Sequence, residues 1–430
     1  MLGYDAMRAA AHALTRHRQV AGFALASFAG ALVLRGVNVG QPNVFVFDEI
    51  YYANDALDLL TRGAERAFAA HPPLGKWLLA LGISIGGFDP TAWRMPAVLC
   101  GAVTVSLVYL CAARVTGSPR LSLLASVLVL TDGIAFTTSR LALLDGFAAM
   151  ATTALIALLL LTSDSKKVIR IAVAAGLLAG AAAAIKWTAL PVLPVAAGVC
   201  GLRAGRQHRG ASVAAACVAL VVALAVVAYA ASYSGWLVGG ARFGDCSSNS
   251  CSGGVVDRLT DLPHVQDAML EYGLNLDRVN PQLAPGWRWL LQDRPTVLFA
   301  DDCRGAADPA CVPGATGPIT IEAAGSPVLW WTSLPCLCLV LFDVRRRRAR
   351  LPGVSDARLV AISAVVLWAP WALSSSTYTF YAAPIVPCLA ITAVVVIRTY
   401  VPARAVGLAG AAVAVLAIAS FALTWPQLVG

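Results

Sequence analysis

Charged residues are scarce in this chain. Asp, Glu, Lys and Arg together make up 13% of its 430 residues, whereas 59% are hydrophobic. Soluble domains usually contain about 25% charged residues, so this shortage excludes a soluble enzyme built around one large core. The apolar runs are long enough to cross a bilayer, which takes about 20 residues per helix. The sequence therefore predicts an all-α polytopic membrane protein.

The sequence also lacks a cleavable leader, an internal repeat and a nucleic-acid-binding pattern. Its first apolar stretch is long and has no convincing cleavage site, so we predict a retained span. A transporter should show inverted repeats and helices broken near the membrane midplane, and no convincing repeat is present. The net charge of +9 reflects basic short loops, which set membrane orientation and do not indicate nucleic-acid binding.

Eleven apolar runs are predicted to span the membrane, with the N-terminus in the cytoplasm. In this orientation every short cytoplasmic loop is basic, including the run at 345–350, and two long segments face outward. The predicted spans are residues 19–36, 92–113, 121–137, 141–161, 169–186, 187–202, 211–234, 327–343, 358–374, 378–397 and 403–424. The predicted parts are an N-terminal cytoplasmic segment with the first span (1–36), a first extracytoplasmic loop (37–91), spans 2–7 (92–234), a large extracytoplasmic loop domain (235–326) and spans 8–11 (327–430).

Four of the 11 cysteines lie in the large outer loop, whereas the other seven lie in predicted spans, where cysteine serves as a small apolar filler. The four are Cys246, Cys251, Cys303 and Cys311. Two short-range disulfides, 246–251 and 303–311, fit an oxidising compartment. A zinc site is the alternative, but no histidine accompanies these cysteines at the usual ligand spacing.

Both outer loops are expected to contain ordered elements. Residues 257–276 have a helical hydrophobic rhythm, and residues 316–325 contain a short strand-like run. In the first loop, Pro72 and Pro73 suit the start of a helix, where a missing N–H costs nothing. The apolar run that follows them is short for a span, which predicts a helix lying along the membrane interface.

Two adjacent carboxylates, Asp48 and Glu49, follow an apolar run and precede Tyr51 and Tyr52. Ordinary loop acids would simply be solvated. In partly apolar surroundings at a membrane surface, however, a carboxylate is suited to general-base work on a hydroxyl. The pair could also bind a divalent cation. We therefore treat both as candidate catalytic residues.

Further charged groups are predicted to gather on the same outer side. Charges inside or at the edge of a membrane are costly and suggest a function, and cations there can hold a lipid phosphate. Arg140 and Asp145 share a short outer turn, so they could instead pair with each other. The candidate residues for binding a donor phosphate or sugar are His71, Lys76, Arg94, Arg140, Asp145 and Lys186.

Five motifs resemble, in order and approximate spacing, those of the protein O-mannosyltransferase family (glycosyltransferase family 39, GT-C fold). They are FDEIYYANDALDLL, HPPLGKWLLALG, WRMPAVLCGAVTV, SRLALLDGF and IKWTAL. The resemblance covers about residues 40 to 390 and looks most like the actinobacterial members. A lone Asp-Glu pair would be a weak signal, whereas five ordered motifs are a strong one.

This resemblance implies a multi-pass enzyme of the cell membrane whose active site lies on the extracytoplasmic face. It would move mannose from a polyprenyl-phosphate carrier to Ser or Thr hydroxyls of proteins, including acceptors emerging from the secretion translocon. Asp48 resembles the catalytic base, and Glu49 would support it or position the acceptor. Arg94 and Arg140 match basic positions that bind donor phosphate or order the site. Phosphate is a fair leaving group, so the implied single inverting displacement requires no cofactor, although a divalent cation could assist.

Two positions depart from the family pattern. Ser374, Ser375 and Ser376 stand where the family usually has an Arg shortly before Phe-Tyr, and Ala69 stands where eukaryotic members have an Asp before His-Pro-Pro. One alternative interpretation is therefore a GT-C transferase that moves a sugar from polyprenyl phosphate to a lipid or cell-wall glycan. A transporter is the alternative outside enzymes.

Overall fold

The computed structural model describes residues 2–65, 70–208, 210–239, 254–275, 283–302, 318–342 and 354–429. These residues form helices and one two-stranded hairpin. The helices before the large loop are α1 (Leu2–Gly36), α2 (Glu49–Arg62), α3 (Leu74–Gly86), α4 (Pro90–Thr116), α5 (Pro119–Leu130), α6 (Gly133–Thr138), α7 (Leu144–Leu161), α8 (Val168–Ile185), α9 (Val192–His208), α10 (Ala211–Ala231) and α11 (Ser234–Gly239). The later elements are α12 (Val255–Leu274), β1 (Thr296–Asp302), β2 (Pro318–Ala323), α13 (Pro327–Phe342), α15 (Val354–Ala372), α16 (Val386–Tyr400) and α17 (Val406–Val429).

Seven helices in the described part of the chain are long and apolar enough to cross a membrane. They are Arg18–Gly36, Pro90–Thr116, Leu144–Leu161, Val168–Ile185, Trp187–Gln207, Ala211–Ala231 and Val406–Pro426. The shorter apolar helices α5, α13 and α16, together with α15, occupy the other predicted spans. The all-α polytopic architecture is therefore confirmed, whereas the number of spans remains a prediction.

One predicted span, 121–137, is divided into two helices at Asp132. The Asp132 carboxylate caps α6 by accepting from the Ala135 N–H at 3.0 Å. Its other oxygen accepts from the Ser326 N–H and from Trp330 Nε1, both at 2.9 Å. A buried carboxylate is costly unless it is hydrogen-bonded. The break between α5 and α6 places the Asp132 carboxylate where it accepts these hydrogen bonds. The turn ties α6 to the start of α13.

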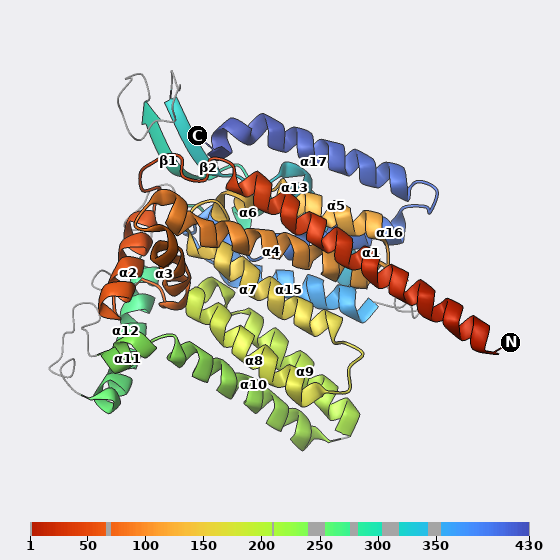
Figure 1. Cartoon of the computed structure of the whole chain (residues 1–430), viewed down its shortest axis with the longest axis horizontal. Coiled ribbons are helices and arrows are strands. Elements are labelled where there is room, and N and C mark those ends of the chain that lie inside the picture. The colour runs from red at the N-terminus through yellow and green to blue at the C-terminus, as the bar shows by residue number, and fades with distance from the viewer. Residues whose placement is uncertain are drawn as a thin grey trace.

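The long helices run side by side between two ends of the molecule (Figure 1). At one end lie α2, α3, α11 and α12, which are the parts of the two long loops that form helices. The connections from α7 to α8 and from α9 to α10 lie at the opposite end (Figure 1). The predicted loop elements are confirmed: α12 matches the helix expected at 257–276, β2 matches the strand expected at 316–325, and α3 begins directly after Pro73.

Small residues bring α8 and α10 into close contact. A Cβ added at Gly180 would lie 2.2 Å from the Ala225 carbonyl oxygen, and one added at Gly176 would lie 2.7 Å from that of Val221. Small residues four apart allow membrane helices to approach closely enough for their backbones to pack. These two glycines therefore set the spacing of the α8–α10 pair.

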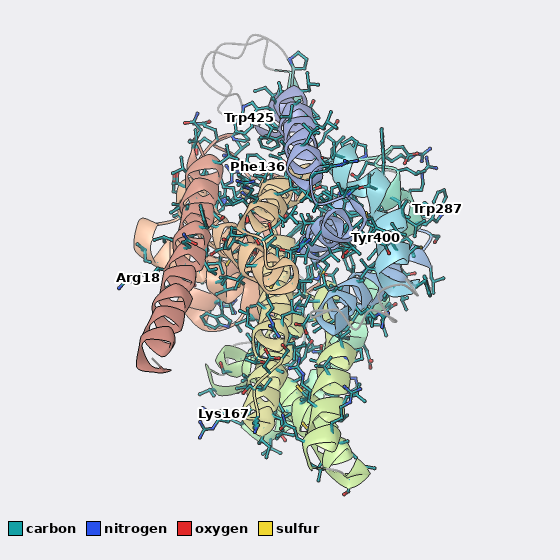
Figure 2. The ribbon with its side chains drawn as sticks, turned by 90° about the vertical axis from the view of Figure 1, so that its right-hand side faces the viewer. Arg18, Phe136, Lys167, Trp287, Tyr400 and Trp425 are labelled. Carbon is teal, nitrogen blue, oxygen red and sulfur yellow. The ribbon has the colours of Figure 1, made fainter. Side chains whose placement is uncertain are left out.

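The last helix, α17, contacts β2, α5, α6, α13 and α16, and aromatic side chains near its C-terminal end pack against α6. Phe136 of α6 packs against Phe421 and Trp425, with ring centroids 5.1 and 5.4 Å apart. Figure 2 shows Phe136 and Trp425 on neighbouring parts of the molecule. Most of the remaining surface of α17 is exposed and apolar, as expected for a helix that faces lipid.

Candidate active site

The loop before α2 is organised by Arg94, which projects from the first turns of α4. Its guanidinium donates to the carbonyl oxygens of Val39 (3.1 Å), Pro42 (3.0 Å) and Val44 (2.8 Å). It also forms a two-pronged pair with Glu49, at 2.8 Å to Oε1 and 2.7 Å to Oε2. Both side chains are fully buried. Arg94 therefore shapes the apolar run 44–47 into an irregular loop instead of a strand.

Glu49 has its carboxylate oxygens engaged within the fold. Besides Arg94, it accepts from the Val46 N–H at 2.9 Å and from the Ala142 N–H at 2.8 Å. These bonds join the first outer loop to the turn before α7. Of the two roles expected from the sequence, these contacts favour support of Asp48 over positioning of an acceptor.

Asp48, by contrast, is half-buried. Its carboxylate accepts one hydrogen bond within the described part of the chain, from the Tyr52 hydroxyl to Oδ2 at 3.0 Å. Burial raises the pKa of its carboxyl, while Lys186 and the Tyr52 hydrogen bond partly oppose that rise. Burial also raises the pKa of Tyr52 well above its usual value, with Asp48 adding to the effect, so the Tyr52 hydroxyl remains a donor. A carboxyl whose pKa is raised in this way is a stronger base than an ordinary aspartate and is suited to accepting the proton of a hydroxyl.

Lys186 is a buried cation whose charge acts on the Asp48 carboxyl. Its Nζ is 2.7 Å from Asp145 Oδ2 and 4.3 Å from the centre of the Tyr381 ring. Lys186 follows the last residue of α8 in an extended conformation, which directs the ammonium toward these partners. The aromatic ring and the carboxylate together offset the cost of burying the ammonium.

His71 packs beside Tyr52, the residue that donates to Asp48. Its ring centroid lies 5.8 Å from that of Tyr52. Burial lowers the pKa of the imidazole well below its usual value, and Lys186 and Lys76 lower it further. His71 is therefore neutral, which leaves one ring nitrogen as a donor and the other as an acceptor.

A cavity of about 310 Å³ adjoins these residues. This volume lies at the lower end of the range for small-ligand pockets. Polar groups converge on it from four separate parts of the chain, and aromatic and aliphatic side chains form the rest of its wall. The main polar and aromatic lining residues are His71, Lys186, Trp187, Tyr272, Trp371, Ser374, Ser376 and Tyr381.

Lys76 is already paired within the protein. Its Nζ lies 2.8 Å from Asp55 and 2.9 Å from Glu65, and all three side chains are buried. Burial tends to lower the pKa of Lys76, but Glu65 and Asp55 raise it overall. Burial raises the pKa of Glu65 to about 7 despite the attraction of Lys76. These contacts make Lys76 a link between α2, α3 and the loop before His71, and not an exposed ammonium at the membrane surface.

The proposed bridge between Arg140 and Asp145 is wrong. Asp145 pairs with Lys186, whereas Arg140 donates to the carbonyl oxygens of Arg35 (3.0 Å) and Val37 (2.7 Å) at the end of α1. The last carbonyls of a helix have no partner within it and attract cations. Arg140 therefore caps α1, which places the start of the first outer loop.

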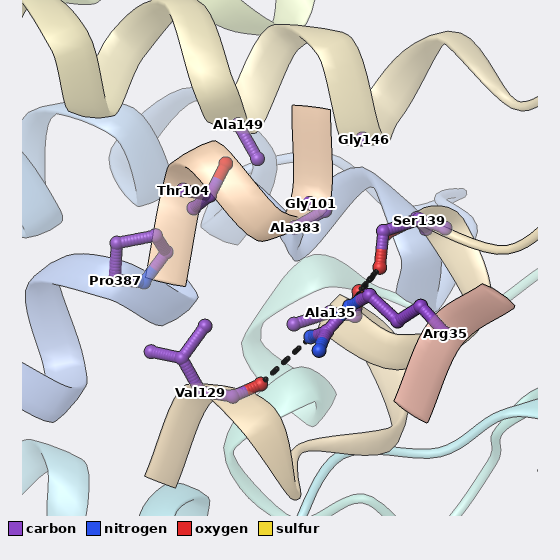
Figure 3. Close-up of a pocket in the computed structure, with 11 residues that line it drawn as sticks. Arg35, Gly101, Thr104, Val129, Ala135, Ser139, Gly146, Ala149, Ala383 and Pro387 are labelled. Carbon is purple, nitrogen blue, oxygen red and sulfur yellow. Dashed lines mark hydrogen bonds between the residues drawn. The ribbon is translucent and has the colours of Figure 1, made fainter. Parts of the chain in front are cut away.

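Arg35 reinforces the same junction from α1. Its Nε donates to the Ser139 hydroxyl at 2.6 Å and its Nη2 to the Val129 carbonyl at 3.3 Å (Figure 3). A cavity of about 10 Å³ adjoins the guanidinium, which is room for about one water molecule. The Arg35 and Arg140 side chains both lie over the Phe136 ring, at 5.8 and 5.3 Å.

The structure thus separates the predicted site residues into two groups. His71 and Lys186 line the cavity, Asp145 pairs with Lys186, and Asp48 is connected to His71 through Tyr52. Glu49, Lys76, Arg94 and Arg140 hold the surrounding loops. The four loop cysteines, Cys246, Cys251, Cys303 and Cys311, lie outside the described residues. The described residues contain no cluster of three or more His, Cys, Asp or Glu side chains with the geometry of a metal site.

Sequence reasoning missed Tyr272, Tyr381 and the carboxylate partners of Lys76. Tyr381 and Tyr272 line the cavity from segments far from Asp48 in sequence. The Phe-Tyr pair at 380–381, which follows the serine run, was the available signal for Tyr381. No spacing in the sequence indicates that Glu65 lies beside Lys76.

Two family models match this chain, and both describe dolichyl-phosphate-mannose-protein mannosyltransferases. One matches residues 70–233 and the other residues 25–94. A relative from Mycolicibacterium smegmatis, named polyprenol-phosphate-mannose–protein mannosyltransferase, is 28% identical over 415 residues. That similarity covers 84% of this chain and 78% of the relative.

Solved structures with the same fold include a chain of the S. cerevisiae protein O-mannosyltransferase Pmt1–Pmt2 complex bound to the sugar donor. It matches with a TM-score of 0.73 at 12% identity, over 96% of this chain and 90% of its own. ArnT from Cupriavidus metallidurans bound to undecaprenyl phosphate matches with a TM-score of 0.60 at 16% identity, over 95% of this chain and 77% of its own. At these identities the likeness establishes the fold.

Proposed function

We propose, from the similarity of this chain to dolichyl-phosphate-mannose-protein mannosyltransferases, that it transfers mannose from polyprenyl-phosphate mannose to Ser or Thr hydroxyls of proteins. The observation that carries this proposal is that the half-buried Asp48 carboxyl is connected through Tyr52 to His71, which lines the cavity together with Lys186. A base and a cation associated with one small cavity are what a displacement at a sugar phosphate needs.

The proposed reaction is a single inverting displacement. Asp48 accepts the proton of the acceptor hydroxyl while the hydroxyl oxygen forms a bond to the anomeric carbon of mannose. The bond between that carbon and the phosphate oxygen breaks, and polyprenyl phosphate leaves with the electron pair. One proton passes to the carboxylate, so no oxidant or reductant is needed.

We assign the cationic side of the site to Lys186. Its ammonium is held by Asp145 and Tyr381 at the cavity wall, where a preorganised positive charge stabilises the negative charge that develops on the leaving phosphate. The neutral His71 imidazole supplies a hydrogen-bond donor on the same wall. Arg94 and Arg140 act indirectly, because they hold the loop that carries Asp48 in place.

We further propose that the cavity opens on the extracytoplasmic face of the cell membrane. The α7–α8 connection, which contains Lys166 and Lys167, lies at the end of the bundle away from α2, α3 and α12 (Figure 1). The end of α9, whose sequence includes Arg203 and Arg206, lies at the same end. Positively charged loops remain in the cytoplasm. The loops at 37–91 and 235–326 would then form the outer part of the enzyme.

The direct test supplies membranes containing this chain with radiolabelled polyprenyl-phosphate mannose and a peptide rich in Ser and Thr. We expect label in the peptide, on the hydroxyl side chains. Label found only in lipid or in a glycan would instead favour a GT-C transferase with a non-protein acceptor. Absence of labelled product of any kind, with folded chain in the membranes, would contradict both.

The hydrogen bond from Tyr52 predicts a shift in the pH dependence of transfer. Asp48 must be ionised to accept a proton, so the rate should fall as pH decreases through its raised pKa. Tyr52→Phe removes a donor that favours the ionised form, so the acidic limb should move to higher pH. A hydrogen bond to a charged group is worth roughly 1.5–3 kcal/mol, which corresponds to a shift of about 1–2 pH units.

The measurement is kcat/KM for the peptide across pH, and Tyr51→Phe is the matched control. Tyr51 is the neighbouring tyrosine on α2 and is largely exposed. Its variant should keep the wild-type profile. Identical profiles for wild type and Tyr52→Phe would remove Tyr52 from the proposed mechanism.

A further inference from the structure

The two strands of the β1–β2 hairpin differ in their contacts with the helices of the molecule. β2 contacts both α17 and α6, whereas β1 has its main contacts with β2. The strands pair antiparallel from Thr296 opposite Ala323 to Asp302 opposite Pro318, with an irregularity between Val297 and Phe299. β1 is therefore the outer strand of a two-stranded sheet.

The base of the hairpin is fixed, although its outer edge is open. The Thr379 hydroxyl accepts from the Thr296 N–H at 2.9 Å and donates to the Ala323 carbonyl at 2.8 Å. Beyond Thr296, none of the hydrogen bonds defined for the described residues joins the β1 backbone to anything except β2. The open edge of β1 thus carries backbone donors and acceptors suited to an additional strand.

Most of the β1 edge is not protected by its composition. Natural edge strands are usually blocked by charged side chains, especially Lys, or by Pro. The segment TVLFA at 296–300 has none of these, whereas the last two residues of β1, Asp301 and Asp302, are charged. Leu298 is buried beneath the strand, whereas Ala300 is exposed. An unprotected strand of this kind is suited to pairing with an extended polypeptide.

The edge strand and the loop before Asp48 belong to one hydrophobic cluster. Leu298 and the partly buried Phe299 are in the same cluster as Val46 and Phe47, the residues just before Asp48. Phe47 in turn packs against Phe380, with ring centroids 5.6 Å apart. Phe380 is the neighbour of Thr379, which holds the base of β1. The loop carrying Asp48 and the open strand are thus connected by continuous side-chain packing.

We propose that the open edge of β1 binds the acceptor polypeptide as an added β-strand, which presents a Ser or Thr hydroxyl to Asp48. This inference rests on the proposed function and extends it to the conformation of the acceptor. Main-chain hydrogen bonds would bind any extended segment, while the cavity would contact only the reacting side chain. The enzyme would therefore select unfolded or extended acceptors over helical ones.

Acceptor peptides that are N-methylated at one backbone position at a time provide the first test. In an added strand, backbone N–H groups point alternately toward and away from the neighbouring strand. We expect KM to rise about tenfold at alternate positions and to stay unchanged between them; a tenfold change corresponds to about 1.4 kcal/mol. A uniform KM across the series, with transfer to the unmodified peptide intact, would overturn the inference. No transfer to the unmodified peptide would instead count against the proposed function itself.

Disulfide trapping provides the second test, with a control on the partner strand. Ala300 and Thr320 lie opposite each other in β1 and β2. An added strand would lie about 5 Å from β1 but about 10 Å from β2, and a disulfide requires Cα atoms less than about 7 Å apart. A cysteine-containing acceptor peptide should therefore be captured by Ala300→Cys and not by Thr320→Cys, above the wild-type background. Equal capture by both, or coupling of Ala300→Cys to a second copy of the chain, would overturn the inference.

Discussion

Replacing Asp48 by Asn is expected to abolish mannose transfer while the protein stays folded. General-base catalysis by a positioned side chain contributes about 10²- to 10⁴-fold to a rate, and an amide cannot accept the proton of the attacking hydroxyl. The side chain keeps its size, and the Tyr52 hydroxyl can still donate to the amide oxygen. The measurement is the rate of transfer from labelled polyprenyl-phosphate mannose to peptide, in membranes with matched amounts of chain.

Folding should survive this change because Asp48 does not hold the loop. That role belongs to Glu49, which joins the loop to Arg94 and to the Ala142 N–H. The matched control is Asp164→Asn, since Asp164 is highly exposed and forms its ion pair with Arg114 of α4, away from the cavity. The control should transfer mannose at the wild-type rate. A wild-type rate in Asp48→Asn as well would refute the assignment of the base.

Replacing Arg94 by Met should cause a large loss of stability. The substitution leaves the Glu49 carboxylate buried without its cation and leaves three loop carbonyls without their donor. Removing one partner of a buried ion pair typically costs about 3–5 kcal/mol. The free energy of unfolding, or the midpoint of thermal unfolding in detergent, should show this loss, and transfer should fall because the Asp48 loop is no longer held.

An exposed pair of the same chemistry provides the control. Arg288 pairs with Asp293 on the surface of the outer loop, and exposed pairs contribute little to stability. Arg288→Met should therefore leave the unfolding midpoint close to that of wild type. A midpoint for Arg94→Met as high as that of Arg288→Met would mean that the Arg94–Glu49 pair does not hold the loop.

The positions of the helices could be predicted well from the sequence, because long apolar runs have few other stable conformations in a membrane. The exceptions arise at polar groups. The run 121–137 breaks at Asp132 because its carboxylate binds donors from Ser326 and Trp330, nearly 200 residues later in the chain. Nothing local to that run indicates those partners.

The candidate site was predicted only in part, for the same reason. Asp48, His71 and Lys186 were identified as charged or polar groups on the outer side. The structure places His71 and Lys186 in one cavity wall and connects Asp48 to His71 through Tyr52. Their pairing could not be predicted. The sequence left open a pair between Asp145 and Arg140, five residues away, yet Asp145 binds Lys186, 41 residues away. Proximity in sequence is a poor guide when helices from different parts of the chain pack together.

By itself, the sequence indicated a helical membrane protein with its candidate catalytic carboxylates on one side, and its ordered motifs indicated the family. Apolar length, loop charge and motif order are properties of the sequence itself, so they can be assessed without a structure. The tertiary structure decided how each charge is partnered. Arg94, Glu49, Lys76 and Arg140 are engaged in the surrounding loops, whereas Lys186, paired with Asp145, lines the cavity, and Asp48 is connected to the cavity wall through Tyr52. That division depends on which buried charge finds which partner, and burial in a medium of low dielectric makes those pairings specific.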